Sequence, residues 1–287
     1  MKVYNLGSLN VDYVYSVDHF VSAGETVASY KLERHPGGKG LNQSVAIARA
    51  GGTALHGALI GDGAGFLRDQ LNDSGVDTSF MRREDGDPGH AIIQVDRNGE
   101  NCIMLFAGTN RKLDRDYVKE FLSGASEGDI LLAQNETNCI GEAFDEARSK
   151  GMKIAFNPSP FDDEIKNLPL GFVDLWFCNE IEGAALTGVT DPDAMCDEFI
   201  KMFPKSALVL TLGEEGSVYC DLHGKVRQSA YKANAVDTTA AGDTFTGYFL
   251  ANLSKGVEFA LDIASRASSV TVSRMGASSS IPYYDEL

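Results

Sequence analysis

Residues 236–245 read Val-Asp-Thr-Thr-Ala-Ala-Gly-Asp-Thr-Phe, with small residues directly before an acid. Apolar side chains follow at helical spacing, so we expect a helix over residues 240–256. The first N–H groups of a helix have no internal acceptor, and the helix dipole is positive at this end. Ala240, Ala241 and Gly242 therefore predict a binding site for a phosphate or a developing anion.

Asp243 lies directly beside this predicted anion site. A carboxylate there would repel a phosphate, so it suits a base that removes a proton from the group attacking the phosphate. The plainer interpretation is an acid in the first turn that stabilises the dipole of its own helix. A second glycine-rich stretch far upstream favours the catalytic interpretation.

This second stretch is residues 35–43, His-Pro-Gly-Gly-Lys-Gly-Leu-Asn-Gln. Its glycines let the backbone come close to a ligand, and Lys39 supplies a compact charge with three donors. Asn42 follows about one helical turn after Lys39, so both side chains can face one pocket. No Ser or Thr follows Lys39, which excludes a Walker-type phosphate loop.

Composition excludes some classes of partner. The chain has 25 Lys and Arg against 41 Asp and Glu, a net charge of −16, which argues against nucleic acid and anionic membranes. The five cysteines show no metal-site or disulfide spacing. Cys102, Cys178 and Cys220 lie in strand-like runs and are expected as core or sheet residues. No apolar run reaches the roughly 18 residues of a membrane span, so we expect a cytoplasmic protein.

Short apolar runs alternate with helical patterns through much of the chain. Such runs followed by helices indicate a parallel sheet covered on both faces, hence an α/β fold. Ligands bind such sheets at the carboxyl ends of their strands. The predicted strands are residues 128–134, 153–157, 172–177 and 206–212. The polar residues Glu136, Asn157, Asn179 and Thr211 lie at the carboxyl ends of these strands.

Two regions depart from this pattern. Residues 12–34 and 88–107 alternate in β fashion, and Asn98-Gly99 suits a hairpin turn. We interpret them as a small β-sheet lid. Residues 1–11, 35–87 and 108–287 then form one α/β domain.

The two glycine-rich sites together resemble the paired signatures of the ribokinase family of sugar kinases, the PfkB family. Residues 37–52 match the first signature and residues 237–249 the second, and matching segments extend from residue 7 to residue 276. The Asn-x-Asp at residues 10–12 makes the chain most similar to the ribokinase branch. The resemblance implies a ribokinase-like fold, a mostly parallel sheet with helices on both faces and a β-sheet lid, and a homodimer in which two lids pack together.

The resemblance also implies the roles of individual residues. Asp243 is the expected base, and Ala240, Ala241 and Gly242 are the expected anion hole. The implied sugar-binding residues are Asn10, Asp12, Gly38, Lys39, Asn42, Glu136 and Asp243. The implied nucleotide contacts are Asn179, Thr211, Gly213 and Gly216. Asn179 and Glu182 are expected to help hold Mg²⁺ near ATP. Asp237, Thr239, Gly276 and Ser280 are the candidate ligands for a monovalent cation, K⁺.

The expected activity is transfer of the γ-phosphate of ATP to a sugar hydroxyl, with ribose phosphorylated at O5 as the first candidate. Kinases of a ketohexose, a deoxyribose or a nucleoside are alternatives on the same fold. A catalytically silent sugar- or nucleotide-binding regulator is an alternative of another class, which the intact Gly242-Asp243 argues against. Asn135 stands where relatives commonly have an apolar residue, and Ser265 where they often have a His near the adenine.

Overall fold

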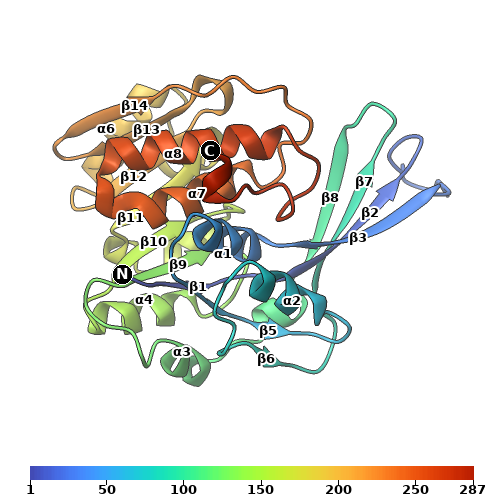
Figure 1. The fold of residues 1–287 in the computed structure, drawn as a ribbon, viewed down its shortest axis with the longest axis horizontal. Coiled ribbons are helices and arrows are strands. Elements are labelled where there is room, and N and C mark those ends of the chain that lie inside the picture. Colours follow the sequence, from blue (N-terminus) through green and yellow to red (C-terminus); the bar gives the residue numbers. More distant parts are fainter.

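An eight-stranded sheet forms the centre of the protein, in the order β14-β13-β12-β11-β10-β9-β1-β4 (Figure 1). The computed structural model describes residues 1–287. In this sheet β4, β1, β9, β10, β11 and β12 run parallel, whereas β13 and β14 are antiparallel strands at one edge. The strands are β1 (Val3–Leu6), β4 (Ala54–Gly57), β9 (Ile130–Gln134), β10 (Lys153–Asn157), β11 (Leu175–Asn179), β12 (Ala207–Thr211), β13 (Ser217–Asp221) and β14 (Gly224–Gln228). The predicted, mostly parallel α/β sheet is confirmed.

Helices cover both faces of this sheet because successive strand residues point to opposite sides. Ala155 of β10 packs in the core beneath α1, α2, α7 and α8, whereas its neighbours Ile154 and Phe156 pack toward α3, α4, α5 and α6. The helices are α1 (Lys39–Arg49), α2 (Phe66–Asp73), α3 (Arg115–Phe121), α4 (Ile140–Ser149), α5 (Glu180–Thr187), α6 (Pro192–Met202), α7 (Ala241–Asn252) and α8 (Val257–Val272). Two cores therefore flank one sheet.

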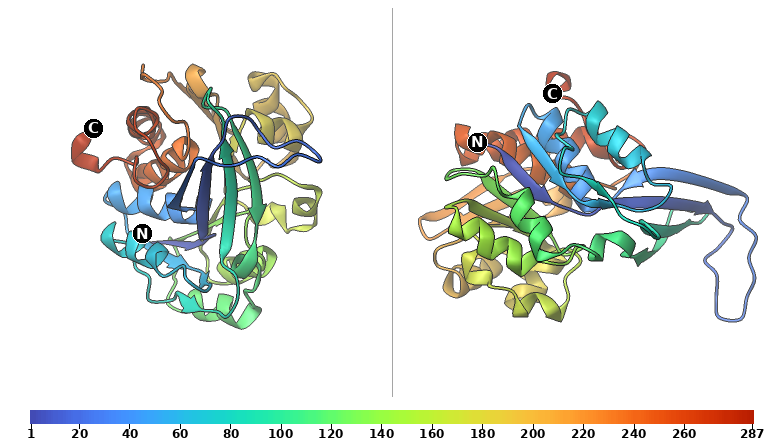
Figure 2. Two further views of the ribbon diagram at one scale, coloured as in Figure 1. Left: turned by 90° about the vertical axis from the view of Figure 1, so that its right-hand side faces the viewer. Right: turned by 90° about the horizontal axis from the view of Figure 1, so that it is seen from below.

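The lid is a separate four-stranded sheet that projects from the body, as Figure 2 shows from two further sides. Its order is β3-β2-β7-β8, with β2 (Asn10–Ser16), β3 (Lys31–Gly37), β7 (Gly89–Val95) and β8 (Asn101–Phe106). The hairpin predicted at Asn98-Gly99 joins β7 to β8, and Gly99 has a φ of 84° there. A further pair, β5 (Leu59–Ile60) and β6 (Arg82–Arg83), lies in the body.

Two local expectations differ from the structure. The strand predicted at 172–177 begins only at Leu175, because Leu170–Phe172 forms a 3₁₀ turn. Only the two ends of segment 12–34 are strands, and residues 17–30 form the loop between β2 and β3. The three cysteines expected as core or sheet residues all lie in strands: Cys178 and Cys220 are buried, and Cys102 is exposed on the edge strand β8 of the lid. No helix has the length and apolar character to cross a membrane.

Candidate active site

The start of α1 and the end of β1 approach each other so closely that only glycine fits at the contact. A Cβ on Gly7 would lie 2.6 Å from the Cα of Gly40, and Gly38 has a φ of 97°, which L side chains rarely adopt. The side-chain amide of Asn5 in β1 donates to the Gly40 carbonyl at 2.8 Å. The glycine-rich stretch therefore fixes the first turn of α1, and with it Lys39, against the carboxyl end of the sheet.

Asp243 lies in the first turn of α7, opposite the first turns of α1. The Asn42 amide donates to Asp243 Oδ2 at 2.9 Å, and the Gln43 amide donates to Asp243 Oδ1 at 2.9 Å. Both carboxylate oxygens are therefore held by donors from one helix. The two glycine-rich sites, far apart in sequence, form one site in the structure.

Burial raises the pKa of Asp243, while Lys39 and the amides of Asn42 and Gln43 act in the opposite direction. Burial also raises the pKa of Glu136, against Lys39 and the Ser8 hydroxyl. Burial lowers the pKa of Lys39, but the charges of Asp243, Glu136 and Glu182 outweigh this and raise it above its usual value. The site thus holds the cation Lys39 among several acids, and burial increases the affinity of Asp243 and Glu136 for a proton.

The small residues before Asp243 expose main-chain donors. Ala240 adopts a left-handed conformation with a φ of 62° as it enters α7, one of only two such non-glycine residues. The Ala241 N–H donates to the Thr238 carbonyl at 3.3 Å, whereas the N–H groups of Ala240 and Gly242 have no acceptor within the protein. These free donors at a helix start fit the predicted anion site.

The predicted sugar-binding residues gather where the lid meets the body. Asn10 and Asp12 lie on β2, and Asp12 pairs in register with His35 of β3, two residues before Gly37. Glu136 follows β9, accepts a hydrogen bond from the Ser8 hydroxyl and accepts one from the Lys39 N–H at 3.2 Å. The structure therefore brings Asn10, Asp12, Gly38, Lys39, Asn42 and Glu136 together.

Two features suit this cluster to hydroxyl groups. Burial, followed by the nearby charge of Glu136, raises the pKa of Asp12 to about 7. Asn42 is buried, and its Oδ1 has no hydrogen-bond partner within the protein, so it can accept one from a ligand. Carboxylate and amide groups in such positions recognise adjacent hydroxyls through several hydrogen bonds at once.

Asn179 and Glu182 form a reciprocal cap at the start of α5. Asn179 Oδ1 accepts from the Glu182 N–H at 2.9 Å, and Glu182 Oε2 accepts from the Asn179 N–H at 2.9 Å. Both side chains line the same cavity as Asp243. No cluster of three or more His, Cys, Asp or Glu side chains offers a metal site. Two partly engaged oxygen ligands fit Mg²⁺, which keeps most of its waters in proteins.

The predicted nucleotide contacts divide into two groups. Asn179 and Thr211 line the cavity at the ends of β11 and β12. Gly213 and Gly216 bound the short 3₁₀ turn that follows Thr211, with φ values of 53° and 103°, and they lie outside the cavity lining.

The predicted cation-binding residues come from two loops that are in contact. Asp237 accepts from the Thr239 N–H and from the Gly276 N–H, each at 2.9 Å. Burial raises the pKa of Asp237, but these hydrogen bonds outweigh it and hold the pKa below its usual value. The Ser280 hydroxyl points instead to the Ala277 carbonyl at 2.7 Å. Asp237, Thr239 and Gly276 are therefore joined directly, whereas no hydrogen bond joins Ser280 to them.

The centre of the site is a cavity of about 230 Å³. Besides predicted residues it is lined by Asn157, Ser159, Thr238 and Thr246, to which the sequence assigned no role. Gln43, also unassigned, contacts Asp243, and the buried Asn110 donates to Asn10 Oδ1 at 2.8 Å. Asn157 and Gln43 carried a signal, since one ends a predicted strand and the other follows Asn42.

Comparison with known proteins agrees with this geometry. The pfkB family of carbohydrate kinases matches residues 2–283. The ribokinase of Staphylococcus aureus is 34% identical over 300 residues, covering 100% of this chain and 98% of the relative. A crystal structure of ribokinase from Thermotoga maritima is similar with a TM-score of 0.88 and 32% identity, covering 100% and 97% of the two chains. The structure of Arabidopsis thaliana ribokinase complexed with ribose and ATP has a TM-score of 0.87 and 26% identity, with 99% and 96% covered.

The fold and the site define an α/β kinase of small molecules, with an acid beside free main-chain N–H groups at the start of a helix and a small β-sheet lid. More specifically, the chain belongs to the pfkB family of carbohydrate kinases, phosphotransferases that use an alcohol group as acceptor. The ribokinase-like fold predicted from the two signatures is confirmed.

Proposed function

We propose that this protein is an ATP-dependent ribokinase that transfers the γ-phosphate of ATP to O5 of ribose. The observation that carries the proposal is Asp243, held by Asn42 and Gln43 beside the free N–H groups of Ala240 and Gly242. A base and an anion site then face the same reacting centre. The proposal is supported by the full-length similarity to ribokinases, one of them solved with ribose and ATP.

In this mechanism Asp243 accepts the proton of the ribose O5 hydroxyl as that oxygen attacks the γ-phosphorus, the bond from the γ-phosphorus to the β–γ bridging oxygen breaks, and ADP leaves. The raised pKa of Asp243 suits a group that must take up a proton. The free N–H groups of Ala240 and Gly242 stabilise the charge on the transferred phosphoryl group, whereas the Ala241 N–H already donates to the Thr238 carbonyl. Phosphoryl transfer depends mainly on positioning and electrostatic stabilisation, which these residues can supply.

The sugar is held at the junction of lid and body by the six residues that meet there. Asp12 and Glu136 accept hydrogen bonds from ribose hydroxyls, and the free Oδ1 of Asn42 accepts another. A site built from polar groups discriminates strongly against analogues that lack the matching hydroxyl. We therefore expect a marked preference for ribose over deoxyribose.

Asn179 and Glu182 are the residues we propose to hold Mg²⁺ through water, while Thr211, Gly213 and Gly216 position the nucleotide. Bound Mg²⁺ would neutralise charge on the phosphates of ATP. The contacting loops of Asp237, Thr239 and Gly276, with Ser280 nearby in sequence, are the proposed K⁺ site. Carbonyl and hydroxyl oxygens from two loops suit such a hard cation.

We further propose a homodimer formed by two lids. Ile103, Met104, Leu105 and Phe106 of β8 are between 50% and 63% exposed, on an edge strand with free main-chain groups. Such a strand is a surface that proteins normally cover. All five cysteines are free thiols, which suits the cytosol as the compartment.

The test is ADP release from MgATP with ribose, deoxyribose, fructose and adenosine, in KCl and in NaCl. The proposal predicts the highest kcat/KM with ribose and faster turnover in KCl. Turnover with only another sugar would support the kinase activity but rule out ribose as the substrate. It would point to Asn10, Asp12 and Asn135 as the residues that determine sugar specificity. Saturable ATP binding without turnover of any sugar would favour the alternative of a catalytically silent sugar- or nucleotide-binding regulator.

A further inference from the structure

A buried chain of side-chain amides runs from β1 to Asp243. Gln134 of β9 donates from Nε2 to Asn5 Oδ1 at 3.0 Å and to Gln43 Oε1 at 2.7 Å. Gln43 in turn donates from Nε2 to Asp243 Oδ1 at 2.9 Å. Asn5, Gln43 and Gln134 are fully buried, and none of them has a role in substrate binding as proposed above.

The direction of every hydrogen bond in this chain is fixed at its far end. The Gly40 carbonyl can only accept, so Asn5 must turn its NH₂ group toward it, as it does at 2.8 Å. Asn5 Oδ1 then faces Gln134, which must present its own NH₂ group. Gln134 uses that NH₂ group for both neighbours, so Gln43 must turn its oxygen to Gln134 and its donor to Asp243.

A second main-chain carbonyl independently imposes the same orientation on the Gln43 amide. The Asn157 NH₂ group donates to the Phe177 carbonyl at 2.8 Å, which leaves Asn157 Oδ1 to accept from Gln43 Nε2 at 3.3 Å. Rotation of the Gln43 amide by half a turn would place oxygen against oxygen at Asp243 and Asn157, and NH₂ against NH₂ at Gln134. Gln134 Oε1 has no partner within the protein, but each of these contacts matches a donor with an acceptor in only one orientation of Gln43.

We propose that Gln43 is a positioning residue, held in one orientation by Gln134 and Asn157, that keeps a hydrogen-bond donor on Asp243 Oδ1 throughout the reaction. This inference rests on the proposed role of Asp243 as base. The donor fixes the plane of the carboxylate, so that its remaining lone pairs face the incoming hydroxyl. It also favours the ionised form, which is the form that can accept a proton.

The charged groups around Asp243 act in both directions. Lys39 of α1 favours its ionised form, and Glu136, beyond β9, opposes it. Glu182 of α5 faces Lys39. None of these groups changes when Gln43 is replaced by methionine, which has a similar length and no donor. Loss of the donor alone should therefore raise the pKa of Asp243.

The test compares Gln43→Met, Gln134→Met and the control Gln70→Met on α2, remote from the site, by kcat, KM and pH profile. Misplacement of a catalytic group can cost about 100-fold in rate, so kcat of Gln43→Met should fall on that scale with little change in KM for MgATP. The acidic limb of the pH profile of kcat should move to higher pH in Gln43→Met. Gln134→Met should change in the same direction by less, and Gln70→Met should match wild type. If Gln43→Met loses only thermal stability, with kcat and acidic limb unchanged, the proposal is wrong.

A measurement without substrate separates this inference from the proposed activity. Carbon NMR titration of the aspartate carboxyl groups, with Asp243→Asn identifying the resonance, reports the pKa of Asp243 directly. A higher pKa in Gln43→Met or Gln134→Met supports the inference even if ribose is not the substrate. An unchanged pKa in the folded variants overturns it, whatever sugar the enzyme uses.

Discussion

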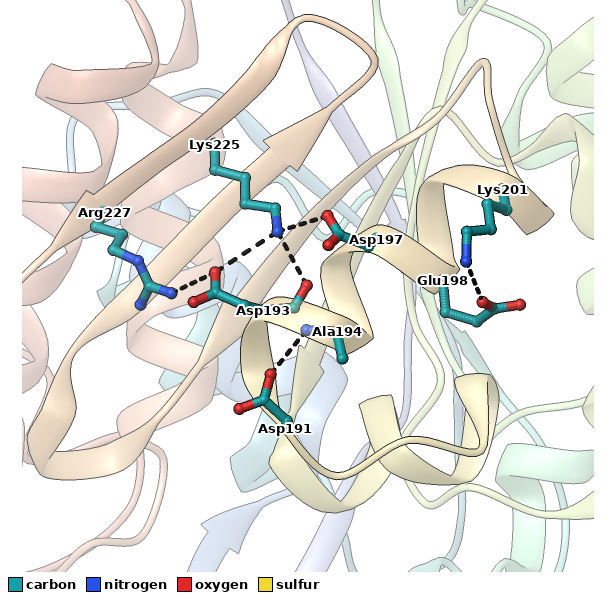
Figure 3. Close-up of polar contacts among 8 residues, drawn as sticks. All are labelled: Asp191, Asp193, Ala194, Asp197, Glu198, Lys201, Lys225 and Arg227. Carbon is teal, nitrogen blue, oxygen red and sulfur yellow. Dashed lines mark hydrogen bonds and ion pairs between the residues drawn. The ribbon is translucent and has the colours of Figure 1, made fainter.

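Two clusters of charged residues in this protein use the same residue types in opposite ways. On the surface, Asp193 and Asp197 of α6 meet Lys225 and Arg227 of β14 (Figure 3). Lys225 lies 2.6 Å from Asp197, and Arg227 lies 2.6 Å from Asp193. In the site, Lys39 lies among acids but makes no ion pair within 4.0 Å.

The two arrangements shift proton affinity in opposite directions. The hydrogen bond from Arg227 lowers the pKa of Asp193, whose charge is satisfied by its partner and by water. Burial raises the pKa of Asp243 and of Glu136, whose charges are only partly compensated. The charges of the surface cluster are thus paired with one another, whereas the buried carboxylates of the site remain available to accept a proton and to bind a ligand. Perturbed groups of this kind mark functional sites.

The largest effect is expected from Asp243→Asn, which removes the proposed base and keeps its size. A positioned general base contributes roughly 10²- to 10⁴-fold, so kcat with ribose should fall by that factor. Binding of MgATP, measured by calorimetry, should persist. A kcat within a few-fold of wild type would remove Asp243 from the mechanism.

The second-largest effect on catalysis is expected from Lys39→Met. The change leaves Asp243 and Glu136 without the cation that favours their ionised forms, so the acidic limb of kcat should move to higher pH. Hydrogen bonds to charged groups contribute about 1.5–3 kcal/mol, so kcat/KM for ribose should fall by roughly 10- to 100-fold. Steady-state kinetics across pH measures both effects. An unchanged pH profile would show that Lys39 does not influence these acids.

Asp12 gives a smaller and pH-dependent effect. Its pKa is raised to about 7, chiefly by burial, so it is largely protonated below that pH and ionised above it. If the carboxylate accepts hydrogen bonds from ribose, KM for ribose should fall as the pH rises through about 7. Asp12→Asn should have a KM that no longer changes with pH in this range. A pH-dependent KM that persists in Asp12→Asn would assign the titration to another group.

The smallest effect is expected from Asp193→Asn on the surface. Exposed ion pairs contribute little because water and salt screen them. The variant should match wild type in kcat and in KM, and its Tm should stay close to that of wild type. A clear loss of activity would break the contrast between the two clusters and would require a connection from α6 to the site.

Much of this structure could be predicted from local patterns. The parallel strands, the helix after Asp243 and the lid hairpin each follow from short-range periodicity and turn residues. The boundary at Leu175 and the loop within residues 17–30 could not, because tertiary packing decides where weak patterns become strands. The exposure of Cys102 also depended on the lid standing away from the body.

The site was predicted in its composition but not in its connections. Asp243 and Lys39 stood out because two glycine-rich stretches far apart in the sequence together resemble the paired signatures of one family. Gln43 and Gln134 did not, since a buried glutamine has no local signal for the partner it will meet across the sheet. The contact of Asp237 with Gly276 likewise depends on two loops that only the fold brings together.

The most direct test of the central claim is phosphorus NMR of wild-type enzyme with MgATP and KCl, with ribose and with 5-deoxyribose in parallel. The account predicts ADP and ribose 5-phosphate in the first sample. It predicts no phosphorylated sugar in the second sample, because 5-deoxyribose lacks the attacking hydroxyl. Phosphorylation of 5-deoxyribose, or a ribose phosphate at another position, would contradict the placement of O5 against Asp243.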